Sequence, residues 1–337
     1  MGILGSLAAG AIMMPASSIA AAARRAADTP GIIDTHHHFM SPAYAKSKGA
    51  IAQARASNSV VLDWSPEISL EAMDKSGVNR AILSLPSGAW FGDVAEGRKL
   101  AREVNEFAAA ACARYPDRLG FFASIPLPDA DGSLAEIAYA FDHLKAAGVM
   151  LKTNYDGKYL GDESFFPVYE ELNRRAAVVY MHPTICYQCE KDFIPELPNP
   201  YLEFVFDSTR TAASLLFTGT LARTRKMKWL FSHGGGTLPM VAGRISGYAA
   251  LHPEMAQRFP DGPKYELQRL FYDTANVTHA DSFAALRAMV PPSQIVFGSD
   301  FPYLKIDPQI EALRSAGLDR LQLSNILGGN AQRIMSV

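Results

Sequence analysis

Eight short runs of apolar, often β-branched residues recur along the chain, and longer stretches with a different pattern separate them. Nearly every position in a run is apolar, whereas a strand with one wet face alternates apolar and polar residues. Continuous apolar runs are typical of parallel strands that are covered on both faces. The runs span residues 31–36, 80–86, 119–127, 148–154, 177–183, 227–235, 270–276 and 295–302.

The stretches between the runs carry apolar residues three or four positions apart, which is the period of an amphipathic helix. In "AEGRKLAREVNEFAAAACARYP" the apolar stripe consists of Leu100, Val104, Phe107 and Ala111. "GSLAEIAYAFDHLKAAG" repeats the pattern, with Ser133 as the expected N-cap and Gly148 beyond the C-terminal end. "SFFPVYEELNRRA" and "STRTAASLLFTGTLART" predict two further helices.

Strand followed by helix, eight times, predicts the α/β class and a (β/α)8 TIM barrel. The rival is a doubly wound open sheet, which would want a glycine-rich phosphate turn after the first strand, where this chain has histidines. A length of 337 residues suits one large domain or two ordinary ones. We therefore expect a leader over residues 1–28 and one barrel over residues 29–337.

The first 30 residues are rich in small apolar side chains and turn polar from Arg24 onward. They predict a secretory signal, with the twin-arginine type as one option, small residues near Ala20 to Ala23 for cleavage, and export to the periplasm. A disordered or membrane-grazing tail on a cytoplasmic protein is the alternative. No other segment has 18 uninterrupted apolar residues, so we expect no transmembrane helix in the body.

Charge and cysteine content exclude some classes of protein. With 32 basic and 34 acidic residues the formal net charge is −2, so we expect no nucleic-acid partner. Three cysteines exclude a disulfide framework. Cys186 and Cys189 form a C-x-x-C without a second pair, so a four-thiolate zinc site is not available. We expect two loop thiols near a pocket, joined as a disulfide if the protein is exported.

Polar residues follow four of the predicted strands, and in a barrel the ends of all strands meet at one face. These residues are His36, His37, His38, His182, His233 and Asp300. His36 and His38 stand two positions apart on a strand, so both point the same way and can bind one metal, whereas His37 must point away and pack. Imidazoles plus a carboxylate suit Zn²⁺ first, with Mn²⁺ or Fe²⁺ as alternatives. The remaining His143, His252 and His279 are expected to be surface or packing residues.

The motifs at these strand ends resemble those of the amidohydrolase superfamily. D-x-H-x-H, "MHP", "SHGGG" and "GSDFP" are similar to its decarboxylase branch, the relatives of aminocarboxymuconate-semialdehyde decarboxylase. "MDKSGVNRAILS", "YLGDESFFPVYEELNRRAAVVYMHP" and "FSHGGGTLPMVAGR" also resemble 6-methylsalicylate decarboxylases. The resemblance covers about residues 31–337.

The resemblance implies a role for each matching residue. It implies that His36, His38, His182 and Asp300 bind one metal, and that His233 holds the metal's water without binding the metal itself. Arg244 matches an arginine that reaches a substrate carboxylate across a dimer interface, so a homodimer or higher homo-oligomer is implied. The hydrolytic branch often has a carboxylated lysine bridging two metals after strand four. Lys152 is the candidate for that role, but the other motifs match the one-metal branch.

One departure from the family pattern bears on the substrate. The muconate enzymes carry an arginine just before the "MD-x-x-GV" element, and "WSPEISLEAMDKSGV" has none there. A monocarboxylated aromatic acid, such as a hydroxybenzoate, therefore fits better than a dicarboxylate. Trp64, Trp90 and Phe91 are candidates for the walls of its pocket, and each is equally an ordinary core or loop aromatic.

We therefore predict a metal-dependent nonoxidative decarboxylase in which Asp300 donates the proton and His233 holds the water or relays protons. A metal-dependent hydrolase of a lactone, ester or C–C bond uses the same ligands and is the second hypothesis. A non-catalytic binding protein on the same barrel is the third, and the presence of all four ligands and His233 speaks against it.

Overall fold

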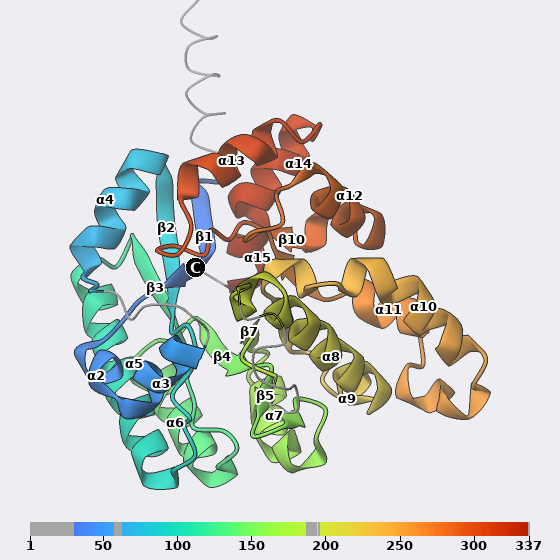
Figure 1. Cartoon of the computed structure of the whole chain (residues 1–337), viewed down its shortest axis with the longest axis horizontal. Helices are drawn as coiled ribbons and strands as arrows, with labels where there is room; N and C mark the ends of the chain where they lie inside the picture. The colour runs from blue at the N-terminus through green and yellow to red at the C-terminus, as the bar shows by residue number, and fades with distance from the viewer. Residues whose placement is uncertain (1–29, 57–62, 187–193, 195, 336–337) are drawn as a thin grey trace, which may run out of the picture.

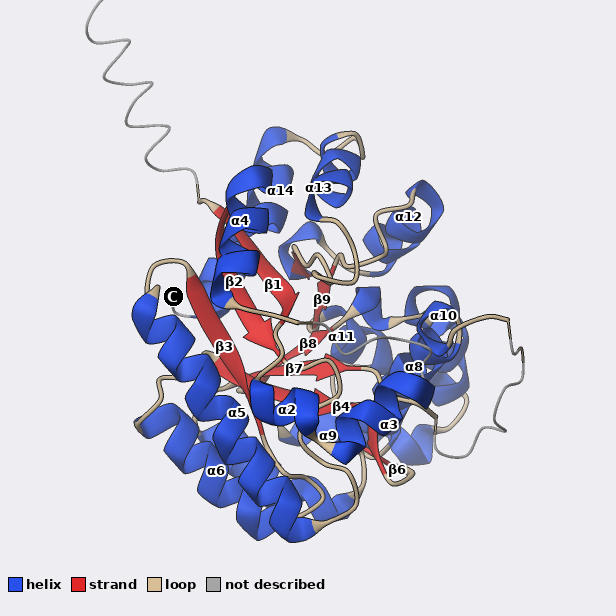
Figure 2. Ribbon diagram, turned by 60° about the vertical axis from the view of Figure 1, so that its left-hand side comes forward, coloured by secondary structure: helices blue, strands red, loops and turns tan. Residues whose placement is uncertain are grey.

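The computed structural model describes residues 30–56, 63–186, 194 and 196–335, so the predicted leader lies outside the described residues. Eight parallel strands form one sheet in the order in which they follow along the chain, apart from a small hairpin of β5 (Asn154–Tyr155) and β6 (Lys158–Tyr159). Figures 1 and 2 show the sheet at the centre and the helices around it. Its strands are β1 (Ile32–His38), β2 (Val78–Ser84), β3 (Leu119–Ser124), β4 (Gly148–Lys152), β7 (Val178–His182), β8 (Lys228–Phe231), β9 (Phe271–Asp273) and β10 (Ile295–Val296).

The first and last strands meet and close the barrel. Thr35 donates its backbone N–H to the carbonyl of Phe297, and Asp300 donates its own to the carbonyl of His36, both at 2.9 Å. His37 and Phe301 form a parallel bridge just beyond the last residue of β10. The predicted (β/α)8 barrel is thereby confirmed, and its seam runs beside the histidine triplet.

Helices cover the outside of the sheet. The main covering helices are α4 (Pro66–Ser76), α5 (Val94–Arg114), α6 (Ala130–Asp142), α7 (Phe166–Arg174), α8 (Glu203–Phe217), α10 (Leu238–Ala250), α12 (Ala280–Met289) and α13 (Ile306–Arg314). Shorter helices are α2 (Pro42–Lys46), α3 (Lys48–Ala56), α9 (Thr220–Arg223), α11 (Pro263–Gln268), α14 (Arg320–Ser324) and α15 (Asn330–Met335). Among the described residues no helix combines the length and the apolar character that a membrane span requires.

The barrel interior is a packed core and not a channel. Buried side chains from the strands fill it, and α15 adds Ala331, Ile334 and Met335. The strand residues are Ile33, Ile82, Phe122, Met150, Val178, Tyr180, Leu230, Phe271 and Val296. A larger core lies between the strands and the outer helices. This leaves the carboxyl ends of the strands as the face on which polar side chains can gather.

Two helices differ from the sequence-based prediction at their ends. α6 begins at Ala130 because the Asp129 carboxylate accepts the N–H of Gly132, so Asp129 is the N-cap and the expected cap Ser133 lies inside the helix. The helix predicted over residues 208–224 is two helices, because Gly219 with a φ of 76° separates α8 from α9. A left-handed φ of this kind ends a helix and suits glycine.

Candidate metal centre

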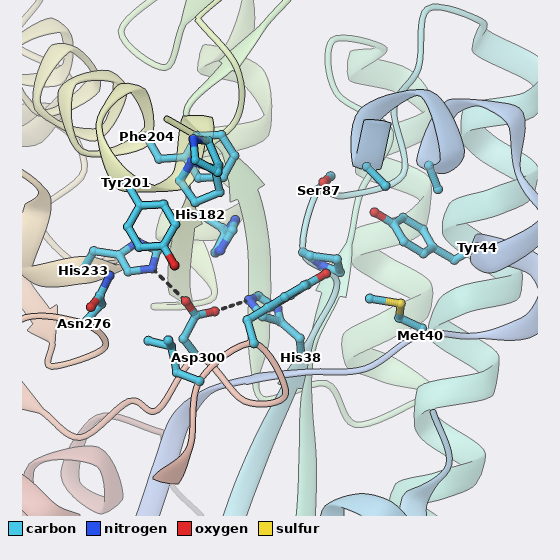
Figure 3. A pocket seen from close by; sticks show the side chains of 17 residues that line it. His38, Met40, Tyr44, Ser87, His182, Tyr201, Phe204, His233, Asn276 and Asp300 are labelled. Atoms are coloured by element: carbon cyan, nitrogen blue, oxygen red, sulfur yellow. Dashed lines mark hydrogen bonds and ion pairs between the residues drawn. The ribbon is translucent and has the colours of Figure 1, made fainter. Parts of the chain in front are cut away.

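The structure brings together the polar residues that follow four strands. His36 and His38 lie at the end of β1, His182 ends β7, His233 begins a short 3₁₀ turn after β8, and Asp300 follows β10. His36, His182, His233 and Asp300 each offer one ligand atom, and these four atoms all lie within 4.8 Å of one another. Figure 3 shows His38, His182, His233 and Asp300 facing one another at one end of a cavity. The structure thus brings these side chains together, and their role as metal ligands stays a prediction.

Distances between the donor atoms suit one metal ion. The Nε2 atoms of His36 and His38 are 3.1 Å apart, and Asp300 Oδ1 lies 3.2 Å and 3.1 Å from them. Metal–ligand bonds of about 2.1 Å place neighbouring ligand atoms roughly 3 Å apart. The ring centroids of His38 and His182 are 4.8 Å apart, so His182 borders the same point. Three imidazoles and one carboxylate therefore fit a divalent transition metal.

Each of the three imidazoles is held through its Nδ1 atom by an oxygen acceptor. The pairs are His36 with Asp273 Oδ2 at 2.8 Å, His38 with the Ser84 carbonyl at 3.2 Å, and His182 with the Pro183 carbonyl at 3.0 Å. A carbonyl or carboxylate oxygen only accepts, so Nδ1 carries a proton in each ring and Nε2 is the nitrogen that can bind a metal. This fixes the tautomer and the ring orientation that a metal ligand needs.

The electrostatics of the cluster favour one positive centre. Burial alone would lower the pKa of His36, but the charges of Asp273 and Asp300 outweigh it and raise this pKa to about 10. Burial lowers the pKa of His38, and burial with neighbouring imidazoles holds that of His182 well below its usual range. Burial would raise the pKa of Asp300, yet the charge of His36 and three imidazole hydrogen bonds hold it well below its usual range. A buried cation is therefore stabilised here, and a divalent ion would be such a cation.

His233 occupies a different position from the other imidazoles. Its Nε2 lies 3.4 Å from Asp300 Oδ2, its backbone N–H donates to Asp273 Oδ1 at 2.8 Å, and its buried Nδ1 has no partner among the described residues. The backbone at His233 has a φ of 51°, and the three following glycines also have positive φ. At Gly236 a Cβ would come within 2.0 Å of the Val205 carbonyl oxygen. The glycines of "SHGGG" thus allow the turn that aims His233 at Asp300, and its role as a non-ligand stays a prediction.

Asp34 connects the two strands that carry ligands on either side of the barrel seam. It is fully buried, and its Oδ1 accepts the N–H groups of His36 at 3.1 Å and Ser299 at 2.9 Å. Its Oδ2 accepts the Ser299 hydroxyl at 2.5 Å and the Nδ1 of His37 at 2.9 Å. One carboxylate therefore fixes the backbone beside His36 and beside Asp300.

His37 points away from the cluster, as predicted. Its Nε2 lies 2.8 Å from the hydroxyl of Ser69, which also accepts the indole N–H of Trp64 at 2.9 Å, and its ring stacks on Phe301. Ser69, His37 and Asp34 have the order of a hydrolytic triad, but all three are fully buried. A serine without access to solvent or cavity cannot act as a nucleophile on a substrate, so this chain of hydrogen bonds is structural.

Asp273 is the residue that sequence reasoning missed. It ends β9, is fully buried, and holds both His36 Nδ1 and the backbone of His233. The run "LFYDTAN" places an acidic residue at a strand end, which is the same signal that identified the histidines. Asp273 therefore sets the orientation of one predicted ligand and the position of the predicted non-ligand.

A cavity of about 350 Å³ opens beside the cluster. Its walls combine apolar side chains with phenols, a serine and an asparagine, and Figure 3 shows several of them facing the interior. The lining residues besides the cluster are Met40, Tyr44, Ala50, Ala54, Pro86, Ser87, Pro198, Pro200, Tyr201, Phe204, Asn276, Tyr303 and Leu304. Among the described residues that line the cavity there is no lysine or arginine.

Aromatic residues that were candidate walls lie outside this cavity. Trp90 is buried, donates its indole N–H to Asp156 at 2.9 Å and packs against Gly97. Phe91 packs behind Tyr44, with ring centroids 6.3 Å apart. Trp64 belongs to the hydrogen-bond chain of His37. Tyr44 and Phe204 supply aromatic walls instead, because α2 and the start of α8 lie over the strand ends.

Lys152 does not join the histidine cluster. It ends β4, is buried, and donates its ammonium to the carbonyl of Trp90 at 3.1 Å. The rings of Phe91 and Tyr155 flank it, and burial lowers its pKa to about 8. The hydrogen bond of its ammonium fixes the loop after β2. This use of the ammonium argues against Lys152 as a bridge between two metals.

Three further predictions concern an arginine, a pair of cysteines and the histidines outside the cluster. Arg244 is exposed on α10, and its predicted contact with a substrate in a second subunit stays a prediction. Cys186 is buried and disulfide-bonded, whereas Cys189 lies outside the described residues. The histidines predicted to be peripheral lie at helix ends, at His143, His252 and His279.

The barrel and its donor cluster define a class of enzyme with a metal site at the strand ends, and comparison with known proteins places the chain within it. A model of the amidohydrolase family matches residues 33–335, and the chain belongs to this family. The decarboxylase macB of Penicillium terrestre is 35% identical over 296 residues, which cover 82% of this chain and 85% of that protein. The 6-methylsalicylic acid decarboxylase acuB of Aspergillus aculeatus is 37% identical over 286 residues, which cover 80% and 84%.

A solved structure shows the same fold. The 5-carboxyvanillate decarboxylase of Novosphingobium aromaticivorans, complexed with manganese and 4-hydroxy-3-methoxy-5-nitrobenzoic acid, superimposes with a TM-score of 0.81 at 18% identity. The match covers 91% of this chain and 96% of that one. The two curated relatives are decarboxylases, and the chain is a carboxy-lyase of the amidohydrolase family.

We predict that metal binding releases about one proton near neutral pH. The pKa of His36 is raised to about 10, so its proton is present below that pH and must leave when Nε2 binds a metal. Apparent affinity should therefore rise about tenfold per pH unit between pH 7 and 9. Titration calorimetry of Zn²⁺ or Mn²⁺ in two buffers of different ionisation enthalpy measures the released protons. Binding without proton release would contradict the assignment of His36.

We also predict that Asp273→Asn weakens metal binding about 10- to 100-fold. The amide keeps an acceptor for the His233 N–H but offers an N–H to His36 Nδ1, which disfavours the tautomer with a free Nε2. The metal dissociation constant measures this effect. Asp207→Asn is the matched control, since Asp207 is fully buried and accepts hydrogen bonds from Asn154 and Tyr159. Equal losses of affinity in both variants would show general destabilisation.

Proposed function

We propose that the protein is a metal-dependent nonoxidative decarboxylase that releases CO₂ from a monocarboxylic hydroxybenzoate of the 6-methylsalicylate kind. The observation that carries this proposal is the cavity, which has a ligand cluster at one end and no cationic side chain among its described lining residues. The charge of an acid with one carboxylate can be neutralised at the ligand cluster, and its ring fits the apolar walls. The relative acuB, named for 6-methylsalicylic acid, supports the substrate class.

For the metal we propose Zn²⁺ or Mn²⁺. His36, His38, His182 and Asp300 would hold it, because their free Nε2 atoms and carboxylate oxygen converge. Three nitrogen donors suit Zn²⁺ and are compatible with Mn²⁺, and the structural neighbour from Novosphingobium contains manganese. A bound divalent ion would supply charge neutralisation and orientation of the ring next to the carboxylate.

The chain's own residues would place one proton on the ring carbon. In the reaction the bond between that carbon and the carboxylate breaks, CO₂ leaves, and a C–H bond forms. Asp300 is ionised in the resting site, since its pKa is held well below its usual range. His233 Nε2, 3.4 Å from Asp300 Oδ2, is positioned to pass it a proton that Asp300 then donates. Phe204, Pro198 and Pro200 line the cavity and would shield one side of the ring from water.

We propose further that the enzyme works as a homodimer or higher homo-oligomer through α10. This helix carries the exposed apolar side chains of Met240, at 77% exposure, and Tyr248, which is half exposed, and its C-cap residue Leu251 is 79% exposed. Large apolar side chains grouped on one exposed face commonly mark an interface. Arg244 lies on the same helix and would reach the substrate carboxylate of a neighbouring subunit.

Metal-loaded enzyme is expected to release one CO₂ per molecule of 6-methylsalicylate consumed and to leave the ring otherwise intact. Gas-phase detection of CO₂ with identification of the phenol product measures this. A panel of lactones and esters serves as the comparison. Release of a new acid from the panel, with no CO₂ from any hydroxybenzoate, would favour the hydrolase hypothesis and contradict the proposal.

A second carboxylate on the far side of the ring should exclude a compound from the site. 4-Hydroxyisophthalate presents such a group to a cavity whose described walls offer it no cation. Burial of an unpaired carboxylate costs several kcal/mol, so we expect binding at least about 100-fold weaker than that of salicylate. Competition of the two acids for the metal-loaded enzyme measures the ratio. Equal binding would show that a cation reaches this end of the cavity.

If Arg244 acts across subunits, mixtures of inactive variants should recover activity. Arg244→Ala and His233→Ala chains are each expected to be inactive, because each lacks one component of every site. A hybrid dimer rebuilds one complete site, so mixing should restore up to about a quarter of wild-type activity when chains exchange at random. Arg244→Lys is the matched variant, since lysine keeps the charge but cannot form two parallel hydrogen bonds. Hybrids that form without recovered activity would contradict the shared site.

A further inference from the structure

Two hydroxyl groups face the cavity on the wall opposite His233 and Asn276. Tyr44 comes from α2, between the first and second strands, and Ser87 comes from the loop after β2. Figure 3 shows both side chains directed toward the space between them and the ligand cluster. They form a polar spot remote from the residues that hold the metal.

Both hydroxyls are available to a ligand. Tyr44 is 2% exposed, so its phenol is removed from bulk water. Burial raises the pKa of Tyr44 to about 12, with the nearby Ser87 hydroxyl opposing the rise, so the phenol is neutral and keeps its proton at physiological pH. The Ser87 hydroxyl lies close enough to the Tyr44 phenol to hydrogen-bond with it, and both residues line the cavity. Each hydroxyl can donate one hydrogen bond and accept others, so a pair of hydroxyls that faces the cavity keeps hydrogen-bonding capacity for a substrate oxygen.

The surroundings of the two hydroxyls define which oxygen suits them. Met40, Ala50 and Pro86 line the cavity beside them, and the described lining contains no cationic side chain. A carboxylate there would be buried without a counter-ion, whereas a neutral hydroxyl both donates and accepts hydrogen bonds. A ring held by the metal at its carboxylate edge directs its opposite edge away from the histidines.

We propose that Tyr44 and Ser87 form a second polar anchor, which binds a neutral hydroxyl on the edge of the substrate ring opposite the carboxylate. This anchor rests on the proposed function and adds a preference within its substrate class, for benzoates that carry a second hydroxyl at position 4 or 5 besides the hydroxyl next to the carboxylate. The two-point attachment fixes the ring between the metal and the α2 wall. The anchor should change KM and the dissociation constant of the substrate, because it touches no reacting atom.

The test compares salicylate with 2,4- and 2,5-dihydroxybenzoate on metal-loaded wild-type enzyme. One well-placed hydrogen bond between neutral groups should lower the KM and Kd of one dihydroxybenzoate about five- to tenfold relative to salicylate. In the Tyr44→Phe and Ser87→Ala variants, the ratio of the salicylate constant to the dihydroxybenzoate constant should fall toward one. Tyr201→Phe is the matched control, since it removes a phenol from the cavity lining outside the anchor and should keep the preference.

Measuring Kd by calorimetry and KM from CO₂ release separates the two proposals. A binding preference that depends on Tyr44, without CO₂ release from any acid, would support the anchor and overturn the proposed function. CO₂ release with equal KM values for all three acids would overturn the anchor and leave the function intact. A preference that Tyr201→Phe removes as fully as Tyr44→Phe does would likewise overturn the anchor. If Tyr44→Phe fails to fold, Ser87→Ala decides the outcome by the same ratio.

Discussion

The buried carboxylate of Asp34 is the interaction on which the site depends. The barrel closes where its first strand meets the segment after its last strand, and two predicted metal ligands stand on opposite sides of that seam. Asp34 accepts hydrogen bonds from the backbone beside each of them and from the hydroxyl of Ser299. A carboxylate buried without such donors would be costly, so barrel closure and ligand placement stabilise each other.

A second buried carboxylate, Asp273, extends the same principle to the other side of the cluster. It fixes the ring of His36 and the backbone of His233, and like Asp300 it places negative charge beside His36. Acidic groups and three oriented imidazoles therefore create a buried space that favours a cation. The cavity beyond it is lined without lysine or arginine among the described residues, so the metal would be the main positive charge that a substrate carboxylate meets.

Much of the fold and of the ligand cluster could be predicted from the sequence because both depend on local patterns. Apolar runs mark the strands, and polar residues at their ends share one face by the geometry of a barrel. The position of His37 followed from alternation along a strand. The cavity walls were predicted less well, because Tyr44 belongs to a short helix whose path over the strand ends depends on tertiary packing. Trp90 has the aromatic character of a wall residue, and only the packing of its loop directs it away from the cavity.

Metal content of two single variants distinguishes a metal ligand from an imidazole that only borders the metal. His182 and His233 both border the cluster, but only His182 has its Nδ1 held by a carbonyl and its Nε2 free, whereas His233 Nε2 faces Asp300 Oδ2. Elemental analysis of purified His182→Ala and His233→Ala, each loaded with Zn²⁺ or Mn²⁺ and dialysed, gives the bound metal per chain. We expect that His182→Ala loses most of its metal, while His233→Ala keeps about one ion per chain and loses most of its turnover. Full metal content in His182→Ala, or loss of metal in His233→Ala, would contradict this expectation.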